Sequence, residues 1–228
     1  MGQSMQRHFV QELEILKTTI IKMGGMTEHA IDDAVKALLE RRGDLAKMVI
    51  EQDPRIDAFE IEIDDAVVDL LALQQPVATD LRFIVAALKI NSELERIGDH
   101  AVNIAESALQ YSALPPVPMH EDIPRMARIA RGMLHDAIDG FIQNNAPLCR
   151  AVLKNDDVID DLNRRVVKDL VENIRREPVC LDQALELVRV SRNLERVADL
   201  STNIAEEVIF MAEARVVKHR FQDRYPSP

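Results

Sequence analysis

The sequence has little cysteine and no long apolar run. Cys149 and Cys180 are the only cysteines among 228 residues, which is too few for a disulfide framework, and their spacing matches no zinc site. The longest apolar run, Phe83 to Leu88, is far shorter than the roughly 18 residues that a membrane-spanning helix requires. No apolar run follows the first residues, so no signal peptide is expected. We therefore expect a cytoplasmic protein that does not insert into a membrane.

Positive charge is also scarce. The chain has 28 Lys and Arg against 39 Asp and Glu, a formal net charge of −11. Nucleic acids and anionic lipids are bound by positively charged surfaces, so this balance argues against both partners. Hydrophobic residues make up 47% of the chain, which is typical of a globular protein rather than a disordered one.

Glycine and proline are concentrated at a few breaks between long helical segments. The densest break, Leu114–Pro118, carries three prolines near the midpoint and favours an extended linker. Between the breaks, apolar residues recur at helical intervals, and no segment alternates as a half-buried strand does. Gly24–Gly25 is a point where the first helix can bend. Pro54 either kinks the second helix or starts it later, with Asp53 as its cap. The fold class is therefore all-α, with six helices at about residues 5–41, 44–73, 77–112, 121–144, 147–176 and 179–218.

The chain repeats itself. Residues 94–106 (LERIGDHAVNIAE) and 194–206 (LERVADLSTNIAE) share eight of thirteen residues at an offset of 100. Upstream, residues 44–57 and 147–160 share five residues at an offset of 103. Because the segments keep the same order, the repeat indicates two tandem, sequence-related three-helix bundles. We place the first at residues 1–114 and the second at residues 119–220.

The repeated segments contain carboxylate pairs four residues apart. Residues at this spacing lie about 5–6 Å apart on one face of a helix, where two like charges repel each other. A hard cation that bridges the two carboxylates would reverse the sign of that interaction. The candidate metal ligands are therefore Asp53 with Asp57, Glu95 with Asp99, Asp156 with Asp160, and Glu195 with Asp199.

The alternative is that these acids are only the solvated face of amphipathic helices. At 100° per residue, Glu95 and Asp99 lie roughly opposite the apolar stripe of Leu94 and Ile97. However, the polar residues of this face recur unchanged in both halves, whereas Ile97 is replaced by Val197. Identity at polar positions favours a specific role. The adjacent Arg96 and Arg196 either contact a phosphate or a partner's carboxylate, or simply balance charge.

Several enzyme motifs are missing from the sequence. It contains no phosphate-binding loop, no dinucleotide-binding glycine motif and no serine nucleophile elbow. The Glu-x-x-His pairs of a buried di-iron bundle are also missing. We find no histidine or cysteine at helical spacing with the paired acids, which argues against a tetrahedral zinc site. His100 follows Asp99 but points about 100° away on a helix, so we expect it on the surface rather than at a metal.

Taken together, three motifs and the repeat resemble the PhoU family, the phosphate-specific transport system accessory proteins of bacteria. The motifs are the E-R-I-G-D segment at 95–99, Q-P-V-A-T-D-L-R at 75–82 and M-G-G-M at 23–26. The resemblance covers residues 8 to 220. The second half departs from the pattern, because E-R-V-A-D replaces E-R-I-G-D and no partner of Q-P-x-A-x-D-L-R is evident around residues 177–186. The resemblance therefore supports the second metal site less strongly than the first.

The resemblance implies a fold of two three-helix bundles, usually in a homodimer, with metal on the acidic helix faces at the eight residues named above. Iron, zinc, manganese or magnesium is implied, and the hard oxygen ligands favour magnesium, manganese or iron over copper. It also implies a negative regulator of the phosphate-starvation response. Such a regulator acts between the ATPase of the phosphate ABC transporter and the sensor histidine kinase of the phosphate regulon.

Two other functions compete with a regulatory adaptor that is not an enzyme. Metals clustered on carboxylates could activate water, which would make the protein a metal-dependent phosphoester hydrolase. The chain could also be a purely structural helical protein with solvated acidic faces. For either metal-dependent function we expect the acidic faces of adjacent helices to converge. This would bring Asp57 near Glu95 and Asp99, and Asp160 near Glu195 and Asp199.

Overall fold

The computed structural model describes residues 2–74 and 76–217, and over these residues the fold is all-α, as predicted. No strand occurs in this part of the chain. None of its helices is both long enough and apolar enough to cross a membrane. The elements are α1 (Gly2–Leu39), α2 (Gly43–Gln52), α3 (Pro54–Gln74), α4 (Ala78–Ala113), α5 (Asp122–Gln143), α6 (Ala146–Arg176), the short 3-10 helix η1 (Pro178–Cys180) and α7 (Leu181–Glu213).

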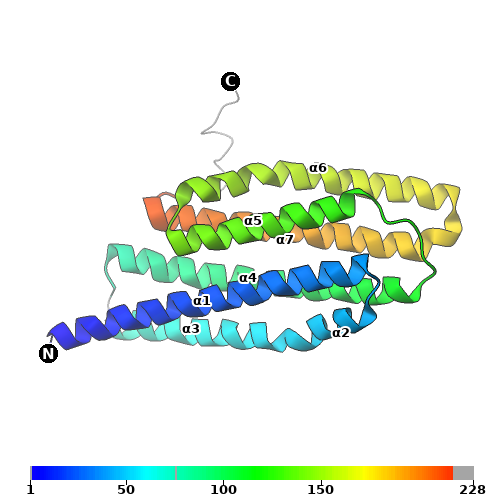
Figure 1. The fold of residues 1–228 in the computed structure, drawn as a ribbon. Helices are drawn as coiled ribbons and strands as arrows, with labels where there is room; N and C mark the ends of the chain where they lie inside the picture. The colour runs from blue at the N-terminus through cyan, green and yellow to red at the C-terminus, as the bar shows by residue number, and fades with distance from the viewer. Residues whose placement is uncertain (1, 75, 218–228) are drawn as a thin grey trace, which may run out of the picture.

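The helices form two halves that lie side by side (Figure 1). In the first half, α2 and α3 follow one another in line, so that with α1 and α4 they make three rods. The second half has the same arrangement in α5, α6 and α7. The tandem pair of related three-helix units is thus confirmed. The halves meet chiefly where α4 packs against α7 and α1 against α5.

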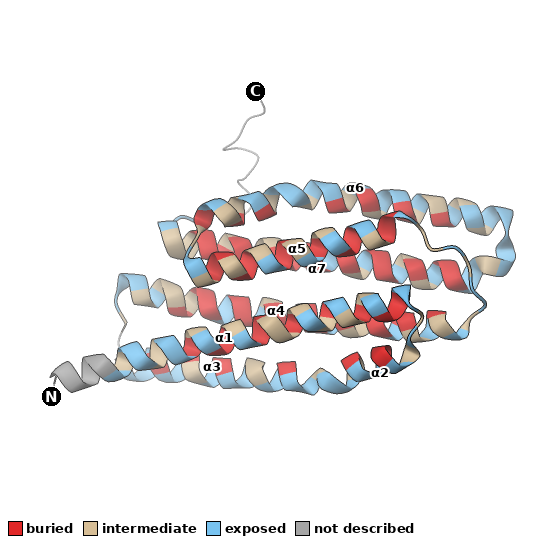
Figure 2. Ribbon diagram, viewed as in Figure 1, coloured by how far each residue is buried: buried red, intermediate tan, exposed pale blue. Residues whose placement is uncertain are grey.

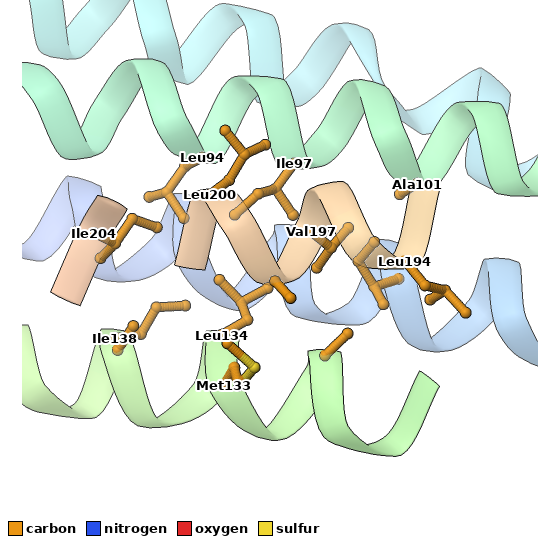
Figure 3. Close-up of a cluster of buried hydrophobic side chains, with 14 of the residues drawn as sticks. Leu94, Ile97, Ala101, Met133, Leu134, Ile138, Leu194, Val197, Leu200 and Ile204 are labelled. Carbon is orange, nitrogen blue, oxygen red and sulfur yellow. The ribbon is translucent and has the colours of Figure 1, made fainter. Parts of the chain in front are cut away.

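The apolar core is continuous between the halves. Buried side chains of all seven α-helices belong to one cluster. Figure 2 shows the buried residues on the inward faces of the helices and the exposed residues on the outward faces. In Figure 3, Leu94 and Ile97 of α4 lie beside Leu200 of α7, and Ala101 of α4 lies nearer Leu194 of α7. The repeated apolar stripes therefore join the two halves as well as filling each one.

Pro54 divides the predicted second helix into α2 and α3. Proline has no N–H to donate to the carbonyl four residues earlier, and its ring clashes with that turn. The main chain restarts at Asp53, whose carbonyl oxygen accepts from the N–H of Ile56 at 2.7 Å and of Asp57 at 3.3 Å. α3 begins at Pro54, as a later start requires, but Asp53 keeps α-helical backbone angles (φ −53°, ψ −42°), so the interruption spans a single residue. The corresponding helix of the second half, α6, runs unbroken.

The first helix continues through Gly24 and Gly25 without a break. A Cβ atom at Gly24 would lie 3.0 Å from Cδ1 of Ile138, so glycine there allows α5 to approach α1 closely. The proline linker is non-helical, as predicted. It is held by Arg41, whose guanidinium donates to the carbonyls of Ser112, at 3.1 Å, and Leu114. The last helix ends at Glu213, where Ala214 takes a left-handed conformation, so the predicted extension is wrong for residues 214–217; residue 218 lies outside the described residues.

Candidate metal centre

In the second half, α6 and α7 bring three carboxylates together. One oxygen each from Asp160, Glu195 and Asp199 lies within 4.8 Å of the others. All three residues are partly buried. This is the convergence expected for α6 and α7. It is also the one such group of metal-ligating side chains in the part of the chain that the structure describes.

Asp156 lies one helical turn before Asp160 and extends this group. One of its carboxylate oxygens is buried and has no hydrogen-bond partner within the described residues. Burial, followed by the charges of Asp199 and Asp160, raises the pKa of Asp156 to about 6. Burial also raises the pKa of Glu195 and of Asp199. The fold thus holds these acids closer together than charge repulsion alone would favour.

The two arginines beside the acids differ between the halves. Arg196 Nη1 contacts Asp199 Oδ2 at 2.9 Å, and its Nε lies 3.8 Å from Glu195 Oε2. Arg96 instead pairs with Glu93 at 3.2 Å. Both contacts are within one helix, and their side chains are more than half exposed. In this structure both arginines pair with acids of their own helices.

In the first half, Asp53, Asp57 and Glu60 face Glu95 and Asp99 across α3 and α4. Burial and the charges of these four neighbours raise the pKa of Glu95 to about 7, with Asp99 and Glu60 the strongest of the four. Burial and nearby acids also raise the pKa of Asp53 and of Glu60. However, no three of these carboxylates approach one another as closely as the second-half group does. The family resemblance supports a metal site more strongly in the first half, whereas the carboxylates lie closer together in the second half.

Gly98 lets the start of α3 approach α4. A Cβ atom there would lie 3.2 Å from Cδ1 of Ile56 and 3.5 Å from Oδ1 of Asp53. The equivalent residue in the second half is Ala198, beside the unbroken α6. The helix break at Pro54 and this glycine together give the first acidic group a different shape from the second.

Three polar residues next to the acids were missed by the sequence analysis. Glu60 lies three residues after Asp57 and faces Glu95. Asn91 and Ser191 are fully buried at equivalent positions and tie α4 and α7 to their neighbours. Asn91 donates to the backbone carbonyl of Glu60 and to Asp64, both at 2.9 Å, and Ser191 donates to Asn163 at 2.6 Å. The sequence held one signal for Asn91 and Ser191, because both are polar residues within an apolar stripe and they are 100 residues apart.

The expectation that His100 lies on the surface is wrong. It is half-buried, and its Nδ1 lies 2.8 Å from Oδ1 of Asn193, in the other half. The rotation about the helix was predicted correctly, but the direction away from Asp99 faces α7 rather than solvent. His100 therefore joins α4 to α7.

The raised pKa values predict that the metal-free protein loses stability as the pH rises. In the folded state Glu95 keeps its proton up to about pH 7, whereas in the unfolded chain it loses the proton near its ordinary value of 4.5. The folded state therefore binds more protons over this interval, and the free energy of unfolding falls as the pH rises through it. After discounting for solvent screening, we expect Glu95 to contribute about 1–2 kcal/mol of this loss.

Thermal unfolding of metal-free protein from pH 4.5 to 8 measures this effect. Glu95→Gln should flatten the fall in Tm, whereas Glu106→Gln, an exposed acid on the same helix, should leave it unchanged. The same pH dependence in Glu95→Gln and the unmodified protein would contradict the assignment.

Comparison with known proteins identifies the family to which the chain belongs. The sequence model of the PhoU domain matches twice, at residues 20–108 and 123–208, once in each half. The chain belongs to the PhoU family. Each match contains one of the two acidic groups, and both lie inside the predicted domain boundaries of 1–114 and 119–220, which stay predictions.

Curated PhoU relatives match nearly the whole chain. The phosphate-specific transport system accessory protein PhoU homolog of Aquifex aeolicus is 38% identical over 92% of this chain and 95% of its own length. The homolog of Pseudomonas putida is 34% identical over 94% of this chain and 84% of its own length.

Solved PhoU structures share the fold. The crystal structure of PhoU from Pseudomonas aeruginosa is 33% identical, with a TM-score of 0.89 over 91% of this chain and 100% of that one. The phosphate transport system regulatory protein PhoU from Streptococcus pneumoniae is 26% identical, with a TM-score of 0.85 over 92% of this chain and 99% of that one.

Proposed function

We propose that this PhoU protein is a negative regulator of the phosphate-starvation response and binds metal on its acidic helix faces. The observation that carries the proposal is the convergence of Asp160, Glu195 and Asp199 from two helices. The names of its relatives, accessory and regulatory proteins of phosphate transport, support the regulatory part. No relative cited above is named as an enzyme.

The donor atoms favour a hard cation. Carboxylate oxygens suit Mg²⁺, Mn²⁺ or iron, and the second-half group offers them from two helices. Of the family's implied metals, Zn²⁺ fits least well, because its structural sites prefer cysteine and histidine. In the second half the ligands are Asp160, Glu195 and Asp199, with Asp156 beside them. In the first half they are Asp53, Asp57, Glu95 and Asp99.

Metal would then act on the packing of the helices. Without a cation, acids on α6 and α7 repel each other across the interface, and so do acids on α3 and α4. A bound cation replaces this repulsion with shared ligation and fixes the spacing of each helix pair. The surface formed by these helices would thereby present one shape to a partner when metal is bound and a looser shape when it is absent.

The proposed partners follow from the family resemblance. We place the protein in the cytoplasm as a homodimer that couples the ATPase of the phosphate ABC transporter to the sensor histidine kinase of the regulon. The acidic helix faces are the candidate docking or metal-sensing surfaces. Their side chains are partly buried or exposed and none belongs to the apolar core, so we expect that they can be changed without unfolding the protein.

A reporter for phosphate-starvation genes tests the regulatory role. Changing Glu95, Asp99, Glu195 and Asp199 to Ala should leave the fold intact, because changes on polar faces usually cost within about 0.5 kcal/mol each. In phosphate-rich medium the same variant should release the genes from repression. A matched control, Glu62→Ala with Asp65→Ala, removes exposed acids of α3 and should repress normally. Normal repression by a stably expressed quadruple variant would contradict the proposal.

One observation favours the alternative, a metal-dependent phosphoester hydrolase. Asp156, whose pKa is raised to about 6, lies beside the convergent carboxylates and could accept a proton from an attacking water. Assaying the purified protein with a phosphate monoester, with and without Mn²⁺, separates the two functions. A Mn²⁺-dependent rate that disappears in Asp156→Asn would support the hydrolase.

A further inference from the structure

A pocket of about 320 Å³ lies in the first half, between α1, α2, the start of α3 and α4. Its volume falls at the lower end of the range for sites that bind small molecules. Much of its wall is apolar and comes from every one of these helices: Met26, Val49, Ile56 and Val102. This wall suits a short aliphatic chain.

The polar part of the wall offers hydrogen-bond acceptors. Asp33 of α1 and Asp53, between α2 and α3, contribute carboxylates from two elements. His29 also lines the pocket, and its Nδ1 lies 2.5 Å from the carbonyl oxygen of Gly25. A carbonyl can only accept, so Nδ1 carries the hydrogen, and Nε2 of the neutral ring is left as an acceptor. An alkylammonium group has three N–H donors, which equals the number of these acceptor groups.

The charge around the pocket is negative. Asp53 belongs to both the pocket and the first acidic group, so the carboxylates of Asp57, Glu95 and Asp99 stand near one wall. Among the lining residues, Arg55 is the one permanently charged base, and it is exposed. A ligand that enters this pocket therefore meets a field that favours a cation over an anion.

Two features at the pocket differ between the halves. The helix C-termini at Arg41 and Asn144, both with positive φ, align α1 with α5 at an offset of 103. At that offset, Asp33 corresponds to Asp136, but His29 corresponds to Gly132. Pro54, which breaks the helix beside the pocket, corresponds to Asp157 in the unbroken α6. In the first half the pocket lies beside the acidic group, whose carboxylates are less tightly grouped than those of the second half.

We propose that this pocket binds a small organic cation, an ammonium group on an aliphatic stem. The stem lies against the apolar wall and the ammonium lies among Asp33, Asp53 and His29. The ammonium comes either from a free diamine or from a lysine side chain of a partner. The pocket shares Asp53 with the predicted first metal site, but Asp33, His29 and the apolar wall belong to none of the predicted metal ligands.

Calorimetric titration of metal-free full-length protein tests the site, with 1,5-diaminopentane and Nα-acetyl-lysine amide as separate probes. We expect one probe molecule bound per chain. Val102→Trp fills the pocket and should weaken binding at least tenfold, whereas Thr202→Trp, at the equivalent position of the second half, should not. Asp33→Asn should also weaken binding about tenfold, and its counterpart Asp136→Asn should leave it unchanged. Tighter binding of the diamine identifies a free ligand, and tighter binding of the lysine amide identifies a side chain.

Arg55→Ala tests the sign of the charge. Removing this exposed cation should strengthen binding of either probe two- to fivefold. If the pocket instead takes an anion, inorganic phosphate will bind and Arg55→Ala will weaken it, which overturns the proposal. Binding of neither probe, or equal losses in Val102→Trp and Thr202→Trp, also overturns it. Mn²⁺ binding by Val102→Trp should equal that of the unmodified protein, so failure here is distinguishable from failure of the metal proposal.

Discussion

Replacing Asp160 and Asp199 by Asn is expected to weaken Mn²⁺ binding in the second half by at least about 100-fold. These residues supply two of the three carboxylates whose oxygens lie within 4.8 Å of one another. Asn is similar in size but carries no charge, so the packing of α6 and α7 is retained while the attraction for a hard cation is lost. Titration of the protein into Mn²⁺, with the free ion followed by electron paramagnetic resonance, measures the affinity and the number of sites.

The matched control changes two exposed aspartates of α6 that lie one helical turn apart. Asp157→Asn with Asp161→Asn removes the same charge from exposed positions. That variant should bind Mn²⁺ with the affinity of the unmodified protein, because salt screens the attraction between exposed charges and a distant cation. Equal losses in the two double variants would mean that Mn²⁺ responds to overall charge and not to the convergent group.

Gly140→Val is expected to destabilise the fold by about 3 kcal/mol, because it overfills the contact between α5 and α6. A Cβ atom at Gly140 would lie 2.4 Å from Sγ of Cys149, which is fully buried. The sulfur cannot move aside without displacing its neighbours in a close-packed core. Denaturant unfolding monitored by circular dichroism gives the free energy.

Gly132 supplies the control on the same helix. A Cβ atom there meets no atom within 4 Å, so Gly132→Val should change the stability by about 0.5 kcal/mol or less. Adding Cys149→Ala to Gly140→Val removes the clashing sulfur and should recover at least about 1 kcal/mol. If Gly140→Val is as stable as Gly132→Val, the close contact between α5 and α6 is wrong.

The sequence was sufficient to predict the helices, because each is long and strongly periodic. It also located the two acidic segments, since Glu95 and Glu195 recur at a fixed offset and lie on α4 and α7. Pro54 was recognised as a break, but either a kink or a new start satisfies proline's lack of an N–H.

The sequence could not show which acidic group would converge more tightly. The distance between carboxylates on two helices depends on how closely the helices pack, which Gly98 and the break at Pro54 alter in the first half. The sequence departures counted against the second half, yet Asp160, Glu195 and Asp199 lie closest together. The direction of His100 toward α7 depends in the same way on packing between the halves.

Sequence motifs could not predict the pocket either. His29 and Asp33 stand four residues apart on α1 and so share one face of that helix. Their partners, Asp53 and Val102, come from other helices. Only the assembled fold shows that these side chains line one space.

Anomalous scattering from crystals grown with Mn²⁺ tests the central claim most directly. We expect an anomalous peak between α6 and α7, within ligand distance of the carboxylates of Asp160, Glu195 and Asp199. The peak should disappear in the Asp160→Asn and Asp199→Asn double variant. Full occupancy of Mn²⁺ elsewhere on the protein, with no peak at this group, would contradict it.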